Sequence, residues 1–141
     1  MVEGAVALLA RHGLQATSFS EVLAATGAPR GSLYHYFPGG KNQLIAAAVE
    51  RAGAMLINAL EPCAGAPADK VVDRFLVIWH TVLTHSQCEA GCAVQAVTVA
   101  ADSADLLAHA AAIFRSWRDR LSRLLHLGGL TQEQSSGSPR C

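Results

Sequence analysis

The chain has 141 residues, of which 51% are hydrophobic and 16% are charged, so it supplies a sizeable core and excludes extensive disorder. Its 11 basic and 11 acidic residues balance, which argues against a protein held to nucleic acid by bulk positive charge. Frequent alanine and sparse Gly/Pro punctuation between residues 41 and 127 favour helices over strands. The predicted fold class is therefore all-α, as one domain or as a small head on a larger body.

The first two predicted helices are short and have recognisable ends. A helix from Val2 to His12 is followed by Gly13 at the position that terminates helices. Thr17 or Ser18 then caps a second helix, with Glu21 three residues after Ser18 in capping-box spacing.

A third short helix completes the amino-terminal pattern. Gly27 makes the turn after the second helix, Pro29 opens the third at its first position, and Pro38-Gly39-Gly40 ends it. Its expected inner face consists of Leu33, Tyr36 and Phe37. Two short helices around a tight turn are the layout of a helix-turn-helix, which places one helix in the DNA major groove.

The following residues predict a longer helical body. Helices are expected from about Lys41 to Leu60, Ala68 to Ser86, Cys92 to Ala101 and Ser103 to Leu127, with a break at Glu61–Pro67. One face of the Ala68–Ser86 helix carries Val72, Phe75, Leu76, Trp79, Val82 and Leu83. One face of the last helix carries Leu107, Ala110, Phe114, Trp117, Leu121 and Leu124. We divide the chain into a helix-turn-helix head (residues 1–40), a helical body (41–130) and a polar, disordered tail (131–141).

Nothing in the sequence indicates secretion or a membrane. No segment reaches the roughly 18 uncharged apolar residues that a membrane helix needs, and no basic stretch precedes an apolar run. Cys63, Cys88, Cys92 and Cys141 form no disulfide framework. A reducing cytoplasm is the expected location.

The run from Gly27 through Arg30-Gly-Ser-Leu-Tyr-His-Tyr-Phe37 resembles the TetR family of bacterial transcription regulators. The Pro38-Gly-Gly-Lys41 corner and Gly91-Cys92-Ala-Val94 resemble its LmrA/YxaF-like branch, and the resemblance covers residues 2 to about 130. It implies an all-α homodimer in which residues 1–40 form the DNA-binding head and residues 41–130 form the effector-binding and dimerisation body. It also implies a repressor that a small hydrophobic effector releases from a palindromic operator.

The third helix carries the residues suited to DNA. Arg30 and Tyr34 lie one turn apart on its outward face, and an arginine can contact guanine with two hydrogen bonds. Gly31 removes a side chain where backbone and DNA would meet. By resemblance and chemistry the candidate DNA-binding residues are Thr17, Arg30, Gly31, Ser32, Tyr34, His35 and Lys41, with Thr17, Ser32 and Lys41 anchoring phosphates. The alternative is a three-helix packing unit, which leaves Gly31 unexplained.

The body carries four large aromatic residues on two helices that should face each other. They form either a packed core or a ligand cavity with His80 or Gln95 as its polar group, and the resemblance favours the cavity. The candidate ligand-binding residues are Phe75, Trp79, His80, Leu83, Phe114 and Trp117.

Metal binding and catalysis are not predicted. His80, His85, Cys88 and Cys92 are ligand types, but their spacing fits no common zinc pattern. No Lys or Arg near Cys88 and Cys92 favours a thiolate for redox sensing. No Ser/His/Asp set, paired carboxylates or phosphate-binding glycine loop is present, so we expect neither an enzyme nor a cofactor.

The sequence departs from the family at both ends. Family members often begin with a basic arm and continue with two further helices that build the dimer interface, and the resemblance implies that this chain is truncated before those helices. The leading hypothesis is a ligand-responsive repressor whose partners are operator DNA, a small hydrophobic effector and a second copy of the chain. The alternative is an all-α ligand-binding or interaction module with impaired operator binding, and a third hypothesis is a small metal-binding protein.

Overall fold

A computed structural model of the protein describes residues 1–87 and 89–130, so Cys88 and the predicted polar tail lie outside the described residues. Within these residues the regular elements are α1 (Val2–His12), α2 (Phe19–Thr26), α3 (Arg30–Tyr36), α4 (Lys41–Leu60), the 3₁₀ helix η1 (Glu61–Cys63), α5 (Ala68–His85), α6 (Ala93–Ala100) and α7 (Ala104–Leu127). The all-α prediction is confirmed, and the predicted ends of these α-helices fall within about one residue of the observed ones.

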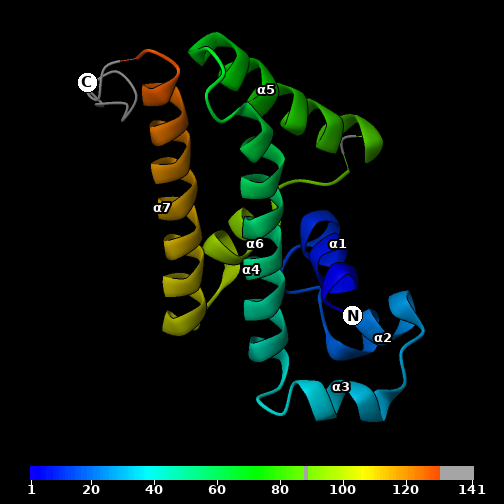
Figure 1. The fold of residues 1–141 in the computed structure, drawn as a ribbon. Coiled ribbons are helices and arrows are strands. Elements are labelled where there is room, and N and C mark those ends of the chain that lie inside the picture. The colour runs from blue at the N-terminus through cyan, green and yellow to red at the C-terminus, as the bar shows by residue number, and fades with distance from the viewer. Residues whose placement is uncertain (88, 131–141) are drawn as a thin grey trace.

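The helices are arranged around α4, which occupies the centre of the molecule (Figure 1). The long helix α7 runs beside α4, and α6 packs on both of them. Helices α1 to α3 gather at one end, where α3 lies crosswise to α4, and α5 lies at the opposite end. The predicted recognition helix therefore occupies an outer end of the molecule.

Local hydrogen bonds explain where α2 begins and ends. The Glu21 N–H donates to Oγ of Ser18 at 3.2 Å, so Ser18 rather than Thr17 is the cap. Gly27 follows the helix with φ 66°, a left-handed conformation that favours glycine, and its N–H donates to the Leu23 carbonyl at 2.9 Å. This turn sets the angle between α2 and α3.

Two apolar clusters form the core. The first joins α1 to α4 and continues into α6 and α7, so the head shares its core with the body; its members include Leu9, Val22, Leu33, Ile45, Val49, Val94 and Ala110. The second joins the far ends of α4, α5 and α7 through Leu56, Leu60, Cys63, Val71 and Leu124. Trp117 packs against both clusters.

Helix α4 together with η1 (Lys41–Cys63) is long and apolar enough to cross a membrane by length and composition, although Glu50 and Arg51 interrupt its apolar run. The apolar residues of this helix form part of the core of the fold. Leu44, Ile45 and Val49 are buried in the first cluster, and Leu56 and Leu60 in the second. A helix that crosses the core between two such clusters needs apolar residues on most of its faces.

The predicted inner faces of α3, α5 and α7 are partly wrong. Tyr36 is 64% exposed, although Leu33 and Phe37 of α3 do pack inward. In α5 the buried residue is Val71, with Phe75, Ile78 and Trp79 packing partly behind it, whereas Val72, Leu76 and Leu83 are exposed. In α7 Leu106 is buried in place of Leu107, and Phe114 is more exposed than predicted.

Candidate nucleic-acid interface and ligand cavity

The outward face of α3 is formed by Arg30, Gly31, Tyr34 and His35, which are all exposed. Leu33 is fully buried and fixes the helix on the core of the head. The ring of Tyr34, which is 55% exposed, packs edge-on against Phe19 of α2 at 5.5 Å between ring centroids. This contact orients the Tyr34 ring while about half of the residue stays open to solvent.

Gly31 has no neighbour that requires a glycine. A Cβ built at this position meets no heavy atom within 4 Å, and the residue has ordinary helical geometry. By contrast, a Cβ at Gly4 would overlap Cγ2 of Thr26, so α1 and α2 cross closely there. Because glycine destabilises a helix by roughly 0.5–1 kcal/mol relative to alanine, Gly31 has no explanation inside the chain.

The Thr17 side chain is buried, although we expected it to contact DNA. Its side chain is 1% exposed, and its hydroxyl donates to the Gly13 carbonyl at 2.8 Å. The hydroxyl thus closes the turn between α1 and α2 and does not reach the surface. We expected the Thr17 side chain to anchor a phosphate; in this structure a one-turn bond back to the main chain competes for the same hydroxyl.

Ser32 and Lys41 remain at the edge of the exposed α3 face. Ser32 is half-buried in the first turn of α3, and its N–H donates to the Pro29 carbonyl at 3.1 Å. Lys41 begins α4, and its Nζ donates to the Leu14 carbonyl at 3.1 Å, which ties α4 to the loop after α1. An ammonium has three donors, so this bond leaves others for a phosphate.

A second tie holds α1 on α4. Nε of Arg51 donates to a carboxylate oxygen of Glu3 at 3.3 Å across the surface. A hydrogen bond from the backbone, and also the nearby Arg51, lower the pKa of Glu3. The carboxylate lies in the first turn of α1, where the helix dipole favours negative charge.

Sequence reasoning missed Tyr36 as a surface residue. It packs edge-on against His35 at 5.4 Å between centroids, so the two rings form one aromatic patch beside the α3 face. Its position four residues after Ser32 would have placed it on the edge of that face. The aromatic character of the segment directed the interpretation toward a core role instead.

The body contains a cavity of about 340 Å³ between α1, α4, α5, α7 and the start of α6. Its wall is almost wholly apolar, and Trp79 and Trp117 line it with their rings edge-on at 6.4 Å between centroids. Nε1 of Trp117 donates to the Gly53 carbonyl at 3.0 Å, which fixes that indole against α4. Small residues facing these indoles leave the space: Ala10, Ala52, Ala59, Gly91 and Ala93.

Of the predicted ligand-binding residues, only Trp79 and Trp117 line this cavity. Phe75 and Phe114 pack behind them, each edge-on against one of the two indoles. His80 and Leu83 are exposed on α5 and do not line the cavity. The signal that sequence reasoning missed was the small residues of α1 and α4, which make room where larger side chains would fill it.

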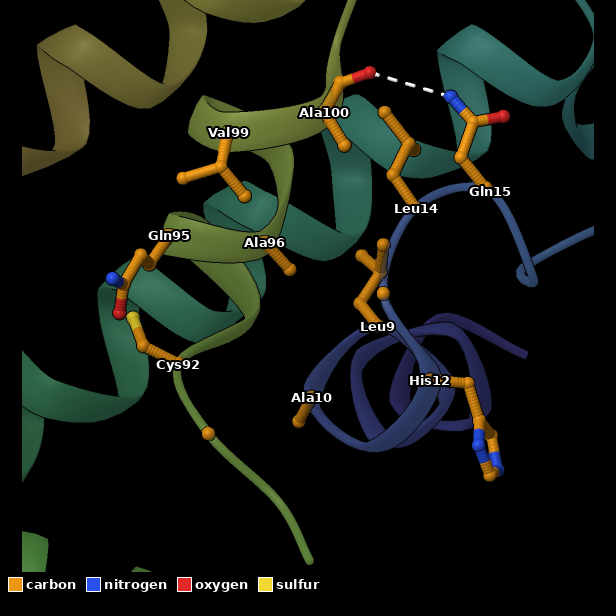
Figure 2. Close-up of a pocket in the computed structure, with 12 residues that line it drawn as sticks. Leu9, Ala10, His12, Leu14, Gln15, Cys92, Gln95, Ala96, Val99 and Ala100 are labelled. Atoms are coloured by element: carbon orange, nitrogen blue, oxygen red, sulfur yellow. Dashed lines mark hydrogen bonds between the residues drawn. The ribbon is translucent and has the colours of Figure 1, made fainter.

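A second hollow, of about 400 Å³, lies between the end of α1 and α6 (Figure 2). Leu9, Ala10 and His12 stand on one side and Cys92, Gln95 and Val99 on the other. At one edge Nε2 of Gln15 donates to the Ala100 carbonyl at 3.4 Å (Figure 2). The hollow and the apolar cavity share three wall residues: Ala10, Gly91 and Cys92.

In the part of the chain that the structure describes, no three His, Cys, Asp or Glu side chains are grouped to hold a metal ion. His80 and His85 lie on exposed positions of α5, and Cys92 lines the apolar cavity. Cys88, the remaining member of that candidate set, lies outside the described residues.

Comparison with known proteins matches both parts of the chain to one family. Residues 1–48 match the family model described as "Bacterial regulatory proteins, tetR family". Residues 67–138 match "Transcriptional regulator LmrA/YxaF-like, C-terminal domain". The second match continues beyond residue 130, where the sequence resemblance was expected to end.

Individual relatives agree with these matches. An uncharacterized HTH-type transcriptional regulator of Mycobacterium tuberculosis (strain ATCC 25618 / H37Rv) is 34% identical, over 96% of this chain and 72% of the relative. The uncharacterized HTH-type transcriptional regulator YxaF of Bacillus subtilis (strain 168) is 27% identical, over 89% of this chain and 68% of the relative. The crystal structure of the regulatory protein TetR from Rhodobacter sphaeroides superposes with a TM-score of 0.78 at 21% identity, covering 89% of this chain and 69% of that one, which shows the same fold.

Members of this family are transcriptional regulators that bind DNA operators, which is a non-enzymatic role. The helix-turn-helix of α2 and α3 and the helical body carry the two matched regions of the chain. The chain therefore belongs to the TetR family of transcriptional regulators, in its LmrA/YxaF-like group.

Proposed function

We propose that α3 enters the major groove of a palindromic operator and that the protein represses transcription until a small hydrophobic effector releases it. The observation that carries this proposal is the exposed α3 face, where Gly31 is a glycine that no intramolecular contact requires. A helix whose backbone approaches a nucleic-acid surface closely needs a residue without a side chain at that point. Repression, the homodimer, the cytoplasmic location and the division into a head at residues 1–40 and a body at 41–130 belong to the same proposal.

Each exposed residue of α3 has a chemistry suited to DNA. Arg30 presents a planar guanidinium that can donate two hydrogen bonds to O6 and N7 of one guanine. Tyr34 and His35 offer ring surfaces to a thymine methyl or a sugar, together with polar groups at their ends. Ser32 and Lys41, at the edge of the face, suit phosphate oxygens and would fix the orientation of the helix.

Effector release is proposed from the apolar cavity. Its volume of about 340 Å³ falls within the range of small-molecule sites, and two indoles line it. A ligand that binds better to one head position than to another would shift the population away from the operator-binding form.

The test is a fluorescence anisotropy titration on the intergenic DNA upstream of the gene, with scrambled DNA of equal composition alongside. Arg30→Ala should weaken specific binding by about 1–3 kcal/mol, roughly tenfold or more, because it removes base contacts. The matched control is Arg118→Ala, which removes an exposed arginine of α7 that pairs with the adjacent Asp119 at 3.0 Å. Equal affinity for scrambled DNA, unaffected by Arg30→Ala, would contradict the proposal.

A further inference from the structure

The cavity that we assign to the effector borders the DNA-binding head itself. Val6 and Ala10, which line it, belong to α1, the first helix of the head. We infer that the effector is an uncharged, aromatic molecule that contacts α1 directly at Val6 and Ala10. This inference rests on the proposed function, because it specifies which molecule acts and where it acts on the head.

The chemistry of the wall selects against charge. Among the described residues, no acidic, basic or histidine side chain lines the cavity. Its polar side-chain groups are the Cys92 thiol and the indole N–H groups of Trp79 and Trp117, and the Trp117 N–H is bonded to the Gly53 carbonyl. A charged ligand would lose hydration there without gaining an oppositely charged partner. The edges and faces of Trp79 and Trp117 instead favour another aromatic ring, through the edge-to-face contacts that they already make with each other.

The position of the cavity connects the ligand with the head. The apolar groups around it belong to both core clusters: Val6 and Ala10 pack against the first, and Ile78 and Trp79 against the second. A molecule in this space lies at the junction between the two clusters. Its nearest rigid neighbour on the head side is α1, whose Leu9 is buried in the same cluster as Leu33 of α3.

The short segment before α6 (residues 89–92) lies between this cavity and the second hollow, which we call the outer hollow. Gly91 donates its N–H to the Ala10 carbonyl at 2.8 Å, and Arg11 lies 3.9 Å from Glu89. Gly91 and Cys92 line both spaces, so the segment has unfilled volume on each side. A ligand that fills the inner cavity presses on both α1 and this segment, and the outer hollow offers room for the segment to move.

The occupancy test uses two fluorophores that share one ring system. N-phenyl-1-naphthylamine is uncharged, whereas 8-anilino-1-naphthalenesulfonate adds a sulfonate to the same rings. Because the only two tryptophans of the chain, Trp79 and Trp117, both line the cavity, quenching of their emission reports its occupancy directly. We expect saturable quenching by one molecule of the uncharged probe per chain, and at least about tenfold weaker binding of the sulfonate.

A matched pair of variants tests the contact with α1. Ala10→Leu fills the cavity from the head side and should weaken binding of the uncharged probe by about tenfold or more. Ala7→Leu makes the same change at an exposed position of the same helix and should leave that affinity unchanged. Equal affinities for the two variants, both folded by circular dichroism, would overturn the direct contact.

A second measurement uses the unmodified chain and does not depend on a variant folding. With methyl-labelled alanine and valine, nuclear Overhauser effects should join the bound uncharged probe to the methyl groups of Val6 and Ala10. Effects confined to methyl groups of the body, such as Val82, would overturn the inference, as would an absence of saturable probe binding. A protein that shows these contacts but does not bind its upstream DNA would instead contradict the proposed function, so the two failures are distinguishable.

Discussion

Gly31 occupies the first turn of a seven-residue helix, a place where most residues would hold the helix better than glycine does. Thr17 shows the opposite relation between sequence and role, since a hydroxyl expected at a phosphate is turned inward to the Gly13 carbonyl. In both cases the surroundings of the residue decide its role. Gly31 faces open space and is available to a partner, whereas Thr17 is occupied by its own chain.

Gly31→Ala separates folding from DNA binding. The added methyl group meets no atom of the protein, so the free energy of unfolding should stay the same or rise by about 0.5–1 kcal/mol. Operator affinity should fall on the order of tenfold, because the methyl group would stand between the helix backbone and the groove. Thermal melting and an anisotropy titration on the same sample measure the two effects. An unchanged operator affinity would show that the α3 backbone does not approach DNA at this position.

At the scale of elements, the close packing of α7 against α4 depends on a second glycine. Gly53 is buried in α4, and a Cβ there would stand 2.8 Å from both Cγ2 and Cδ1 of Ile113 in α7. The carbonyl of the same glycine accepts the Trp117 N–H at 3.0 Å. The close approach of these two helices therefore positions one of the two indoles of the cavity.

Gly53→Ala should destabilise the protein, in contrast to Gly31→Ala. Overpacking at a helix crossing typically costs about 1–3 kcal/mol, and the shift would also strain the bond to Trp117. Chemical denaturation monitored by circular dichroism gives the free energy, and tryptophan emission reports the indole. Ile113→Ala removes the clashing atoms, so the double variant should lose less stability than the two single variants lose together. If Gly53→Ala melts like the unmodified protein, the two helices lie further apart than the structure has them.

The ends of the helices were predictable because punctuation and capping are local. Ser18, Gly27 and the break after Leu60 act within one turn of the chain, so each could be predicted without knowledge of the neighbours. The inward face of α5 could be predicted only in part, because its apolar side chains form a broad stripe along the helix and only packing selects Val71 over Val72. Most lining residues of the cavity were missed for the same reason, since the opposing helices decide which space is left unfilled.

At the scale of the whole molecule, the balance of 11 basic and 11 acidic residues limits what one head can do on DNA. Non-specific binding comes from neutralised phosphates and falls steeply with salt, and this chain supplies few cations near α3. Arg30, Lys41 and His35 are the basic residues of the proposed interface. Useful affinity then requires two heads bound to one operator at the same time.

A comparison of three DNA duplexes tests this requirement: a palindromic operator, one half-site alone, and the palindrome with its half-sites moved apart by half a helical turn. Two linked heads typically gain a factor of about 10²–10⁴ over one, so the palindrome should bind at least a hundredfold more tightly than the half-site. The spaced duplex keeps every base contact but turns the second site to the other side of the helix, so its affinity should fall toward that of the half-site. Light scattering of the complex should give two chains per palindrome. One chain per duplex, with equal affinity for all three, would mean that α3 acts singly, and the interaction-module alternative would then describe the chain better.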